Sequence, residues 1–414
     1  MSAEIINVGD ELLNGETVNT NASYLAEKIQ ELGIELHYQT SVADDSLRLQ
    51  KVIRKALTRS SIIIITGGLG PTKDDITKNV VAGVLGRQLV LHEPTLSKIQ
   101  SKLQSLAYTI SKNNDRIALY PEGAEILDNP IGTAPGLIIS ESEKKIILLP
   151  GVPSELKAIT EKSVIPYLAR HKEKNHVIKH QILKVWGLPE SQVGETLEDV
   201  MGENKNPLVG LRIDIEEGVK VSITARGGSV MIAQNLIEDM ENTIKQKLGD
   251  FIYGAGDLSM EKIVGTLLSI NKKTIAVAES ITGGLVAKKI TDVPGSSNYF
   301  LSSMVTYSNE SKIRDLKIPE ELIKENGVVS EQVCKAMALA IKNISSADIG
   351  LATTGIAGPS GGTSENSVGI AFIGIATELG CKVEKHQFSG IRNVIRIKTA
   401  QTALDMVRRY LIST

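Results

Sequence analysis

The chain has 414 residues, of which 42% are hydrophobic, and this is enough for two or three domains with packed cores. Its 46 basic and 48 acidic residues nearly cancel, so no global field attracts nucleic acid or an anionic membrane. Cys334 and Cys381 lack CxxC or Cys/His ligand spacing, which argues against a disulfide framework or a zinc site. No apolar run approaches the roughly 18 residues of a membrane helix, and the acidic start MSAEIINVGDELL differs from a basic signal peptide. We therefore expect a cytoplasmic protein.

Residues 1–170 alternate strand-like and helix-like patterns, which predicts an α/β domain with a parallel sheet covered by helices. The expected elements are strand EIINVG, a helix over 21–32, strand ELHYQT, a helix over 46–58, strand IIIIT, helix DITKNVVAGVLG ending at Gly86, strand KKIILLPGVPSE and one more helix. The run 61–66 is apolar throughout, as in a central strand that is buried on both faces. The charged segment RHKEKNH that follows is typical of a linker.

Two loops of this domain follow strands: Gly9, Asp10 and Glu11 after EIINV, and residues 67–75 after IIIIT. Ligands of open α/β sheets collect where the carboxyl ends of strands meet loops, so we expect both loops at one crevice. Their glycines allow backbone N–H groups to approach a phosphate, and an aspartate at 74 or 75 can hold a hard cation such as magnesium. In the alternative interpretation, the glycines only form turns and the aspartates offset the dipole of the next helix.

Residues 175–251 predict a compact α+β unit: strand VIKHQILKVW, helix ESQVGETLEDVM, a hairpin with turn EEG, and a helix over 230–248. This order resembles a KH-like module, but the segment has no GxxG loop to clamp a nucleic-acid backbone. We therefore interpret it as a structural spacer and expect no nucleic-acid partner.

Residues 255–414 return to the alternation of strands and helices and predict a third domain, of the α/β class. The expected elements are helix SMEKIVGTLLSIN, strand TIAVAE, a helix from Gly283, a strand near SSMVTYS, a helix ending at Leu316, a helix over 330–344, strands DIGLATT, SVGIAFIGIAT and KVEKHQF, and a final helix over about 393–411.

The stretch TIAVAESITGGL leads from a strand to Ser280 and then to Thr282, Gly283 and Gly284 at a helix start. Free glycine N–H groups at that start would suit a phosphate or a developing oxyanion, with Ser280 as a nucleophile. The alternative is an ordinary Ser/Thr cap on a strand-to-helix turn.

Further segments of the same domain favour the catalytic interpretation of the serine. VTYSNESK supplies Tyr307 and Lys312 after a strand, TTGIAGPSGG is a glycine-rich loop, and FSGIR together with Arg396 adds guanidinium groups. A serine hydroxyl needs a base near pH 7, and a lysine that is desolvated or placed near cations can lose its proton and serve. Hydrolysis of an amide also needs oxyanion donors, for which the backbones of 283–284 and 355–358 are available. The segments together predict an anion site with a nucleophile.

These motifs resemble one family along essentially the whole chain, the CinA (competence/damage-inducible protein A) proteins. The first domain is similar to molybdopterin-binding, MoaB/MogA-like proteins through GDELLNGETVNTNASYLA, GGLGPTKDDIT, GTAPG and LPGVPSEL. The third resembles nicotinamide mononucleotide deamidases through AESITGG, VTYSNESK and GIAGPSGG. The resemblance implies a three-layer, molybdopterin-binding-like domain over 1–170, a KH-type spacer over 175–251 and an α/β deamidase domain over 255–414.

For the third domain, the resemblance implies hydrolysis of nicotinamide mononucleotide to nicotinate mononucleotide and ammonia, without a cofactor, in the recycling of pyridine nucleotide. Ser280 falls on the family's catalytic serine and Lys312 on its lysine, the general base, with Tyr307 as the third catalytic residue. The implied substrate-binding residues are Thr282, Gly283, Gly284, Thr354, Gly355, Ala357, Gly358, Arg392 and Arg396. Two positions depart from the family's pattern: Ile281 replaces a cysteine, which changes packing, and Ile391 replaces an aspartate, which affects efficiency.

For the first domain, the resemblance implies cleavage of ADP-ribose with a divalent metal ion. The implied nucleotide-binding residues are Gly9, Glu11, Asn21, Gly67, Gly68, Gly70 and Thr72, and the metal ligands are Asp10, Asp74 and Asp75. The expected partners are these small nucleotides and a second copy of the chain in a homodimer. A non-enzymatic alternative is a pterin- or nucleotide-binding adaptor in DNA uptake or damage response, although the near-neutral charge weakens its DNA part.

Overall fold

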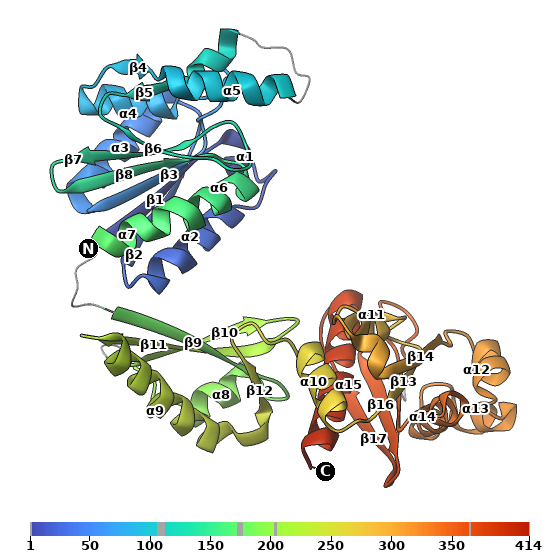
Figure 1. The fold of residues 1–414 in the computed structure, drawn as a ribbon. Coiled ribbons are helices and arrows are strands. Elements are labelled where there is room, and N and C mark those ends of the chain that lie inside the picture. Colours follow the sequence, from blue (N-terminus) through green and yellow to red (C-terminus); the bar gives the residue numbers. More distant parts are fainter. Residues whose placement is uncertain (1, 106–111, 172–176, 203–204, 364–365, 414) are drawn as a thin grey trace. The chain divides into compact units, whose positions relative to one another are not determined.

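A computed structural model describes residues 2–105, 112–171, 177–202, 205–363 and 366–413 (Figure 1). The chain divides into two compact units, residues 1–180 with 225–235 and residues 181–224 with 236–414. The second unit therefore joins most of the middle segment to the C-terminal domain, because Trp186 and Tyr253 pack in the same hydrophobic cluster as the C-terminal strands and helices. Most of the expected linker, residues 172–176, lies outside the described residues.

The N-terminal domain is built on a six-stranded sheet of order β2-β1-β3-β8-β7-β6. Its strands are β1 (Ser2–Val8), β2 (Glu35–Val42), β3 (Ile62–Thr66), β6 (Glu125–Leu127), β7 (Gly136–Glu141) and β8 (Lys144–Leu149). The first three and β8 are parallel, as the sequence predicts, but β7 and β6 are antiparallel and were not predicted. Only two residues separate β7 from β8, and Ser142 has a φ of 51°, so the chain reverses in a tight hairpin.

Helices cover both faces of this sheet (Figure 1). They are α1 (Asp10–Leu13), α2 (Thr20–Glu31), α3 (Ser46–Arg59), α4 (Thr77–Leu85), α5 (Glu93–Ser105), α6 (Pro153–Ile159) and α7 (Ile165–His171), and a short pair, β4 (Leu89–Leu91) and β5 (Leu119–Pro121), flanks them. The three predicted helices α2, α3 and α4 are confirmed to within about two residues, and Gly86 ends α4 in a left-handed conformation.

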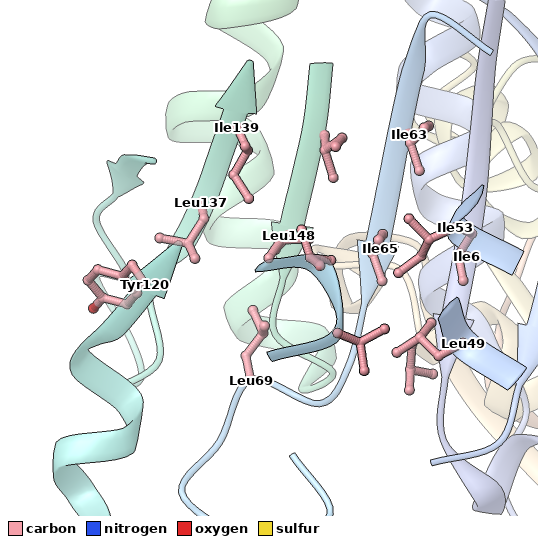
Figure 2. Packing of buried hydrophobic residues seen from close by; sticks show 14 of the residues in the cluster. Ile6, Leu49, Ile53, Ile63, Ile65, Leu69, Tyr120, Leu137, Ile139 and Leu148 are labelled. Atoms are coloured by element: carbon pink, nitrogen blue, oxygen red, sulfur yellow. The ribbon is translucent and has the colours of Figure 1, made fainter. Parts of the chain in front are cut away.

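The run of four isoleucines in β3 shows why this domain has three layers. Ile63 and Ile65 pack toward α3 and α4, whereas Ile62 and Ile64 pack toward α2 and α6. Successive side chains of a strand point to opposite faces, so an unbroken apolar run fits a strand that is covered on both sides. Figure 2 shows the first of these clusters, with Ile63 and Ile65 among residues of the neighbouring strands.

The middle segment forms a four-stranded sheet of order β10-β11-β9-β12 with two helices. Its elements are β9 (Val177–Val185), α8 (Glu190–Thr196), β10 (Leu208–Asp214), β11 (Gly218–Gly227), α9 (Val230–Leu248) and β12 (Ile252–Ala255). The predicted order of strand, helix, hairpin and long helix is confirmed, although α8 ends five residues before the expected boundary.

The C-terminal domain contains a five-stranded sheet of order β14-β13-β15-β16-β17, in which the first three strands are parallel and the last two antiparallel. The strands are β13 (Ile275–Glu279), β14 (Phe300–Val305), β15 (Ile349–Gly355), β16 (Ile370–Thr377) and β17 (Gly380–Gln387). The helices are α10 (Met260–Ile270), α11 (Leu285–Thr291), α12 (Asn309–Leu316), α13 (Glu320–Asn326), α14 (Glu331–Ser345) and α15 (Arg392–Ser413). Clusters on the two faces of the sheet pack against α10, α11 and α15 on one side and α14 on the other.

Within the described parts of the chain, every helix is too short or too polar to cross a membrane. Cys334 and Cys381 are both free, as the sequence predicts.

Replacing Ile65 by alanine should destabilise the N-terminal domain by about 2–5 kcal/mol, because the fully buried side chain would leave a cavity in the cluster of Figure 2. Native-state hydrogen exchange of peptides from β1, β3 and β8 measures this loss. Leu47→Ala is the control, since Leu47 on α3 is 70% exposed and its removal should change stability by less than about 0.5 kcal/mol. Equal losses in the two variants would contradict the packing described.

Candidate active site

The C-terminal domain brings most of its predicted site residues to one edge of the sheet. The strands β14, β13 and β15 are parallel neighbours, so their carboxyl ends lie together. Ser280 follows β13, Tyr307 follows β14, and Thr354 and Gly355 end β15. The start of α15 adds Arg392, whose guanidinium donates to the hydroxyl of Tyr307 at 2.6 Å. This is the edge at which ligands of open α/β sheets bind.

Lys312 and Ser280 form a buried pair. The amine Nζ of Lys312 lies 3.1 Å from Ser280 Oγ and donates to the carbonyl of Thr306 at 2.7 Å. The lysine side chain is fully buried and the serine is only 8% exposed. Ser308 and Ser311 form a capping box at the start of α12, which fixes this helix so that Lys312, one turn later, faces the serine.

Burial lowers the pKa of Lys312 from 10.5 to about 8. An ammonium group loses hydration inside a protein, and this loss favours the neutral amine. The sequence offered two causes, burial and a neighbouring cation, and burial accounts for the shift. Arg392 is occupied with Tyr307 and with the carbonyl of Gly358, to which it donates at 2.7 Å.

The expectation of free N–H groups at Gly283 and Gly284 is wrong. The carboxylate of Glu279 accepts from the backbone N–H groups of Gly284 at 2.9 Å, Val286 at 3.1 Å and Ala287 at 2.8 Å. The N–H of Gly283 donates to the carbonyl of Ser280 at 3.2 Å. An acidic side chain thus already satisfies the start of α11. Sequence reasoning missed Glu279, although an acid at the end of a strand just before a glycine-rich helix start is a readable signal.

The turn over residues 280–284 is also held from the side of α15. Arg396 donates to the carbonyl of Thr282 from Nη2 at 2.7 Å and from Nε at 3.2 Å. The hydroxyl of Thr282 pairs with that of Thr353 at 2.7 Å, and both threonines are fully buried. Thr282 and part of the Arg396 guanidinium therefore bind each other and the scaffold, and their contact with substrate stays a prediction.

The remaining predicted residues line the loop after β15. The hydroxyl of Thr354 donates to the carbonyl of Val328 at 3.2 Å, which ties β15 to the segment before α14. A β-carbon on Gly355 would lie 2.3 Å from the carbonyl oxygen of Ile370, so only glycine fits there. Tyr307 and Arg392 are exposed, as is Gly283, and the tyrosine is 59% exposed.

The two departures from the family pattern differ in their surroundings. Ile281 is buried in a small cluster with Ala357, Ala371 and Ile395, so its effect is on packing, as expected. Ile391 is 74% exposed.

In the N-terminal domain, the predicted glycine loops also lie at the carboxyl ends of parallel strands. Gly9 follows β1 and Gly67 follows β3, where the N–H of Gly67 donates to the carbonyl of Leu149 at the end of β8. The amide of Asn21 donates to the carbonyl of Gly151 at 2.7 Å, which adds a third loop to the group. Gly68 and Gly70 continue the second loop: a β-carbon would meet Thr77 on the first and Asp75 on the second.

The acidic residues of this domain are arranged differently from the prediction. Asp75 accepts from the N–H of Thr72 at 2.7 Å and from its hydroxyl at 2.6 Å, so it closes its own loop. Asp10 and Asp44 instead bind each other, since the carboxylate of each accepts from the backbone N–H of the other. The pKa of Asp44 is raised by burial and by the negative charges of Asp10, Glu11 and Asp74.

A preformed cage of three metal ligands does not occur: no three His, Cys, Asp or Glu side chains in the described residues converge to hold an ion. The role of Asp10, Asp74 and Asp75 as metal ligands therefore stays a prediction. The carboxylates near Asp44 still suit the usual way in which proteins bind magnesium, with one or two carboxylates and the phosphates of the substrate as ligands.

Three family models match the chain in succession. Residues 4–170 match a probable molybdopterin binding domain, residues 180–254 the damage-inducible protein CinA KH domain, and residues 257–411 the CinA C-terminal domain.

Relatives align along the full length. The chain is 46% identical over 412 residues to the putative competence-damage inducible protein of Thermoanaerobacter pseudethanolicus, which covers 100% of this chain and 99% of the relative. It is 43% identical over 412 residues to the CinA-like protein of Kosmotoga olearia, with the same coverage. A solved structure of the protein CinA from Thermoplasma acidophilum, described as of unknown function, is 35% identical and covers 39% of this chain and 94% of its own, with a TM-score of 0.37.

Replacing Lys312 by methionine should make stability depend less on pH. Below pH 8 the folded and unfolded wild type both carry the ammonium, and its burial costs stability; between pH 8 and 10.5 the folded state loses the proton first and the cost disappears. Wild type should therefore gain on the order of 3 kcal/mol relative to Lys312→Met as pH rises through this range. Urea unfolding followed by the fluorescence of Trp186, the only tryptophan, measures it. A difference that does not change with pH would mean an ordinary lysine.

Proposed function

Because the chain belongs to the CinA family over its whole length, we propose that its C-terminal domain is a nicotinamide mononucleotide amidohydrolase that produces nicotinate mononucleotide and ammonia. The family predicted from the sequence motifs is confirmed, and the proposal adds the reaction. The observation that carries it is the 3.1 Å contact between Ser280 Oγ and the fully buried amine of Lys312. A serine next to a desolvated lysine is the arrangement that activates a hydroxyl for attack on an amide.

The first half of the reaction forms an ester. The neutral amine of Lys312 takes the proton of Ser280, whose oxygen attacks the carboxamide carbon of the substrate. When the tetrahedral intermediate collapses, the carbon–nitrogen bond breaks and the lysine ammonium returns its proton to the leaving group, which departs as ammonia. The product of this half is an ester between Ser280 and the nicotinoyl group.

The second half restores the enzyme. Lys312 takes a proton from water, the hydroxide attacks the ester carbon, and the serine oxygen leaves and recovers its proton from the lysine. Nicotinate mononucleotide is released. The N–H groups of Gly283 and Gly284 are already hydrogen-bonded. The proposed donors to the oxyanion of both intermediates are therefore the backbone N–H groups of residues 357–358, in the other glycine-rich segment at this edge.

The pKa of Lys312 decides whether such a base is adequate. With a pKa of about 8, roughly one lysine in ten is neutral at pH 7, against roughly one in 3,000 for a pKa of 10.5. Burial therefore raises the concentration of active base by about two orders of magnitude. The exposed guanidinium of Arg392, steadied by Tyr307, is suited to the phosphate of the mononucleotide, because a guanidinium binds phosphate oxygens in pairs.

For the N-terminal domain, the arrangement favours a second activity, cleavage of ADP-ribose with a divalent cation. The observation behind it is that three loops that contain glycine lie at the carboxyl ends of parallel strands, and that Asp10 and Asp74 are near enough to Asp44 for their charges to raise its pKa. A bound cation would supply charge neutralisation for the phosphates, and the glycine loops would give the nucleotide room to approach the backbone. Nucleotides are then the partners of both domains, and a homodimer remains an expectation.

Ser280→Ala, Lys312→Ala and the double variant should each lose about 1,000-fold or more in kcat for ammonia release and end near the same residual rate. Groups that act as one unit are not additive, since the second removal finds the mechanism already lost. Lys312→Arg should also be inactive, because a guanidinium does not lose its proton at working pH. Wild-type activity should rise with pH through about 8, as the lysine becomes neutral.

Lys324→Ala is the matched control, since this lysine is 66% exposed and pairs only with Glu320 on its own helix. Its activity should equal that of the wild type. An active Lys312→Arg variant with a flat pH profile would contradict the base mechanism and leave Lys312 as a fixed cation.

Asp74→Ala should reduce divalent-dependent cleavage of ADP-ribose by about 100-fold while ammonia release is unchanged, because the carboxylate lies in the other domain. Asp45→Asn is the control: Asp45 caps α3 through its side chain, and asparagine keeps that cap. Phosphoanhydride cleavage measured against magnesium concentration separates the variants. Equal rates for wild type and Asp74→Ala would mean that the aspartate has no part in the reaction.

A further inference from the structure

Glu279 is a buried acid beside the nucleophile for which the reaction just described has no use. It is fully buried at the end of β13, directly before Ser280. We propose that Glu279 is a positioning residue that holds Ser280 and Lys312 in register, acting through the turn that follows it and through Thr306. The proposal rests on the catalytic role given to this pair, and it adds the residue on which their geometry depends.

The side chain of Glu279 organises the turn on the serine side. Its two carboxylate oxygens accept three backbone N–H groups, those of Gly284, Val286 and Ala287. For these N–H groups to face back toward β13, the chain must pass through left-handed conformations, with φ of 58° at Gly283 and 92° at Gly284. Side chains strain this conformation and glycine does not. The two glycines and the acid thus act together to fix the path of the backbone where it turns at Ser280 after β13.

The backbone of Glu279 organises the lysine side. Its carbonyl accepts from the N–H of Thr306 at 2.9 Å, and the carbonyl of Thr306 accepts from Lys312 Nζ at 2.7 Å. One residue is therefore linked to both members of the pair, by its side chain to the turn that carries Ser280 and by its main chain to the acceptor that holds the amine. A shift of Glu279 would move the serine and the lysine by different routes and open the 3.1 Å contact.

Arg396 explains why the carboxylate is needed as a fixed partner. This arginine grips the carbonyl of Thr282, in the same turn whose later N–H groups bind Glu279. The turn is held between a cation on its carbonyl side and an anion on its N–H side. With the acid replaced by a neutral amide, the NH₂ group of the amide could not accept from a backbone N–H, fewer bonds would oppose Arg396, and the turn that carries Ser280 would shift.

The groups that face Lys312 allow a pH test. These are the hydroxyl of Ser280, from the turn after β13, and the carbonyl of Thr306, from the β14 end; neither carries a charge, and burial is the cause of the lowered pKa of the amine. Desolvation lowers the pKa of the amine, so any opening that admits water should return this pKa toward its ordinary value.

The experiment compares wild type with Glu279→Gln, Glu279→Asp and the control Asp348→Asn. Asp348 makes the same kind of contact at the opposite end of β13, where it accepts from the N–H and the hydroxyl of Thr274 at 2.8 Å each. Two rates are followed against pH: ammonia release from nicotinamide mononucleotide, and modification of Ser280 by phenylmethylsulfonyl fluoride, in which the serine oxygen bonds to sulfur and fluoride leaves. Trp186 fluorescence checks that each variant is folded.

Glu279→Gln should lower kcat about 100-fold with KM within about twofold, since a misplacement near 1 Å costs this much and the substrate contacts are elsewhere. The pH midpoint of both rates should move up from about 8 toward 10.5. Glu279→Asp, which keeps the charge on a shorter stem, should fall between this variant and wild type, and Asp348→Asn should match wild type.

Three results would overturn the proposal. One is a folded Glu279→Gln variant that loses activity but keeps the wild-type pH midpoint. In that case fewer molecules would be active and the Ser280–Lys312 pair of each would be unchanged, so Glu279 would have only a structural role. If that variant does not fold, a folded Glu279→Asp protein with wild-type rates would also contradict the positioning role of Glu279.

Sulfonylation that follows the predicted pattern without any ammonia release by wild type would reject nicotinamide mononucleotide as the substrate but keep the role of Glu279. No sulfonylation of wild type at any pH would reject both.

Discussion

Placing an amine where water cannot reach it is the constraint on which the C-terminal domain depends. A buried ammonium costs stability, and a folded protein tolerates it only where the loss is partly offset by hydrogen bonds. Here Lys312 has two such bonds, to a carbonyl and to a hydroxyl, and no carboxylate bonded to its amine. A carboxylate partner would have stabilised the ammonium and raised its pKa. Because both partners are neutral, the pKa of the lysine stays low enough for it to act as a base. Both partners lie directly after the ends of parallel strands, Ser280 after β13 and Thr306 after β14.

The two α/β domains use the same sheet edge in different ways. In the C-terminal domain, Glu279, Arg396 and Thr353 bind the N–H of Gly284 and the carbonyl and hydroxyl of Thr282, so much of the turn after β13 is already hydrogen-bonded within the protein. In the N-terminal domain, the buried oxygen Asn21 Oδ1 has no hydrogen-bond partner among the described residues, and three carboxylates raise the pKa of a fourth. Such groups are consistent with the nucleotide proposed for this domain.

Local signals in the sequence were enough for most of the fold and for selecting Ser280 and Lys312, which the structure brings into contact. The isoleucine run of β3, the caps of α3 and α14, and the glycine after α4 each depend on neighbours in the chain, so they could be predicted. The antiparallel strands β6 and β7 could not, because pairing across a sheet depends on distant partners. The same holds for the site. AESITGG indicated Ser280, but whether its glycine N–H groups are free depends on the direction of the Glu279 side chain. In the same way, the sequence did not show that the Asp75 side chain would turn toward Thr72.

The most direct test of the account is the titration of Lys312 itself in the full-length protein. Lysine labelled with carbon-13 at the ε position reports its protonation state by nuclear magnetic resonance, and the signal that is missing from a Lys312→Met sample identifies the residue. If burial tunes Lys312 as the base, this one signal should have a midpoint near 8, while the exposed lysines should titrate near 10.5. A midpoint near 10.5 for Lys312 would contradict it, because the amine would then be charged at neutral pH and unable to take the proton of Ser280.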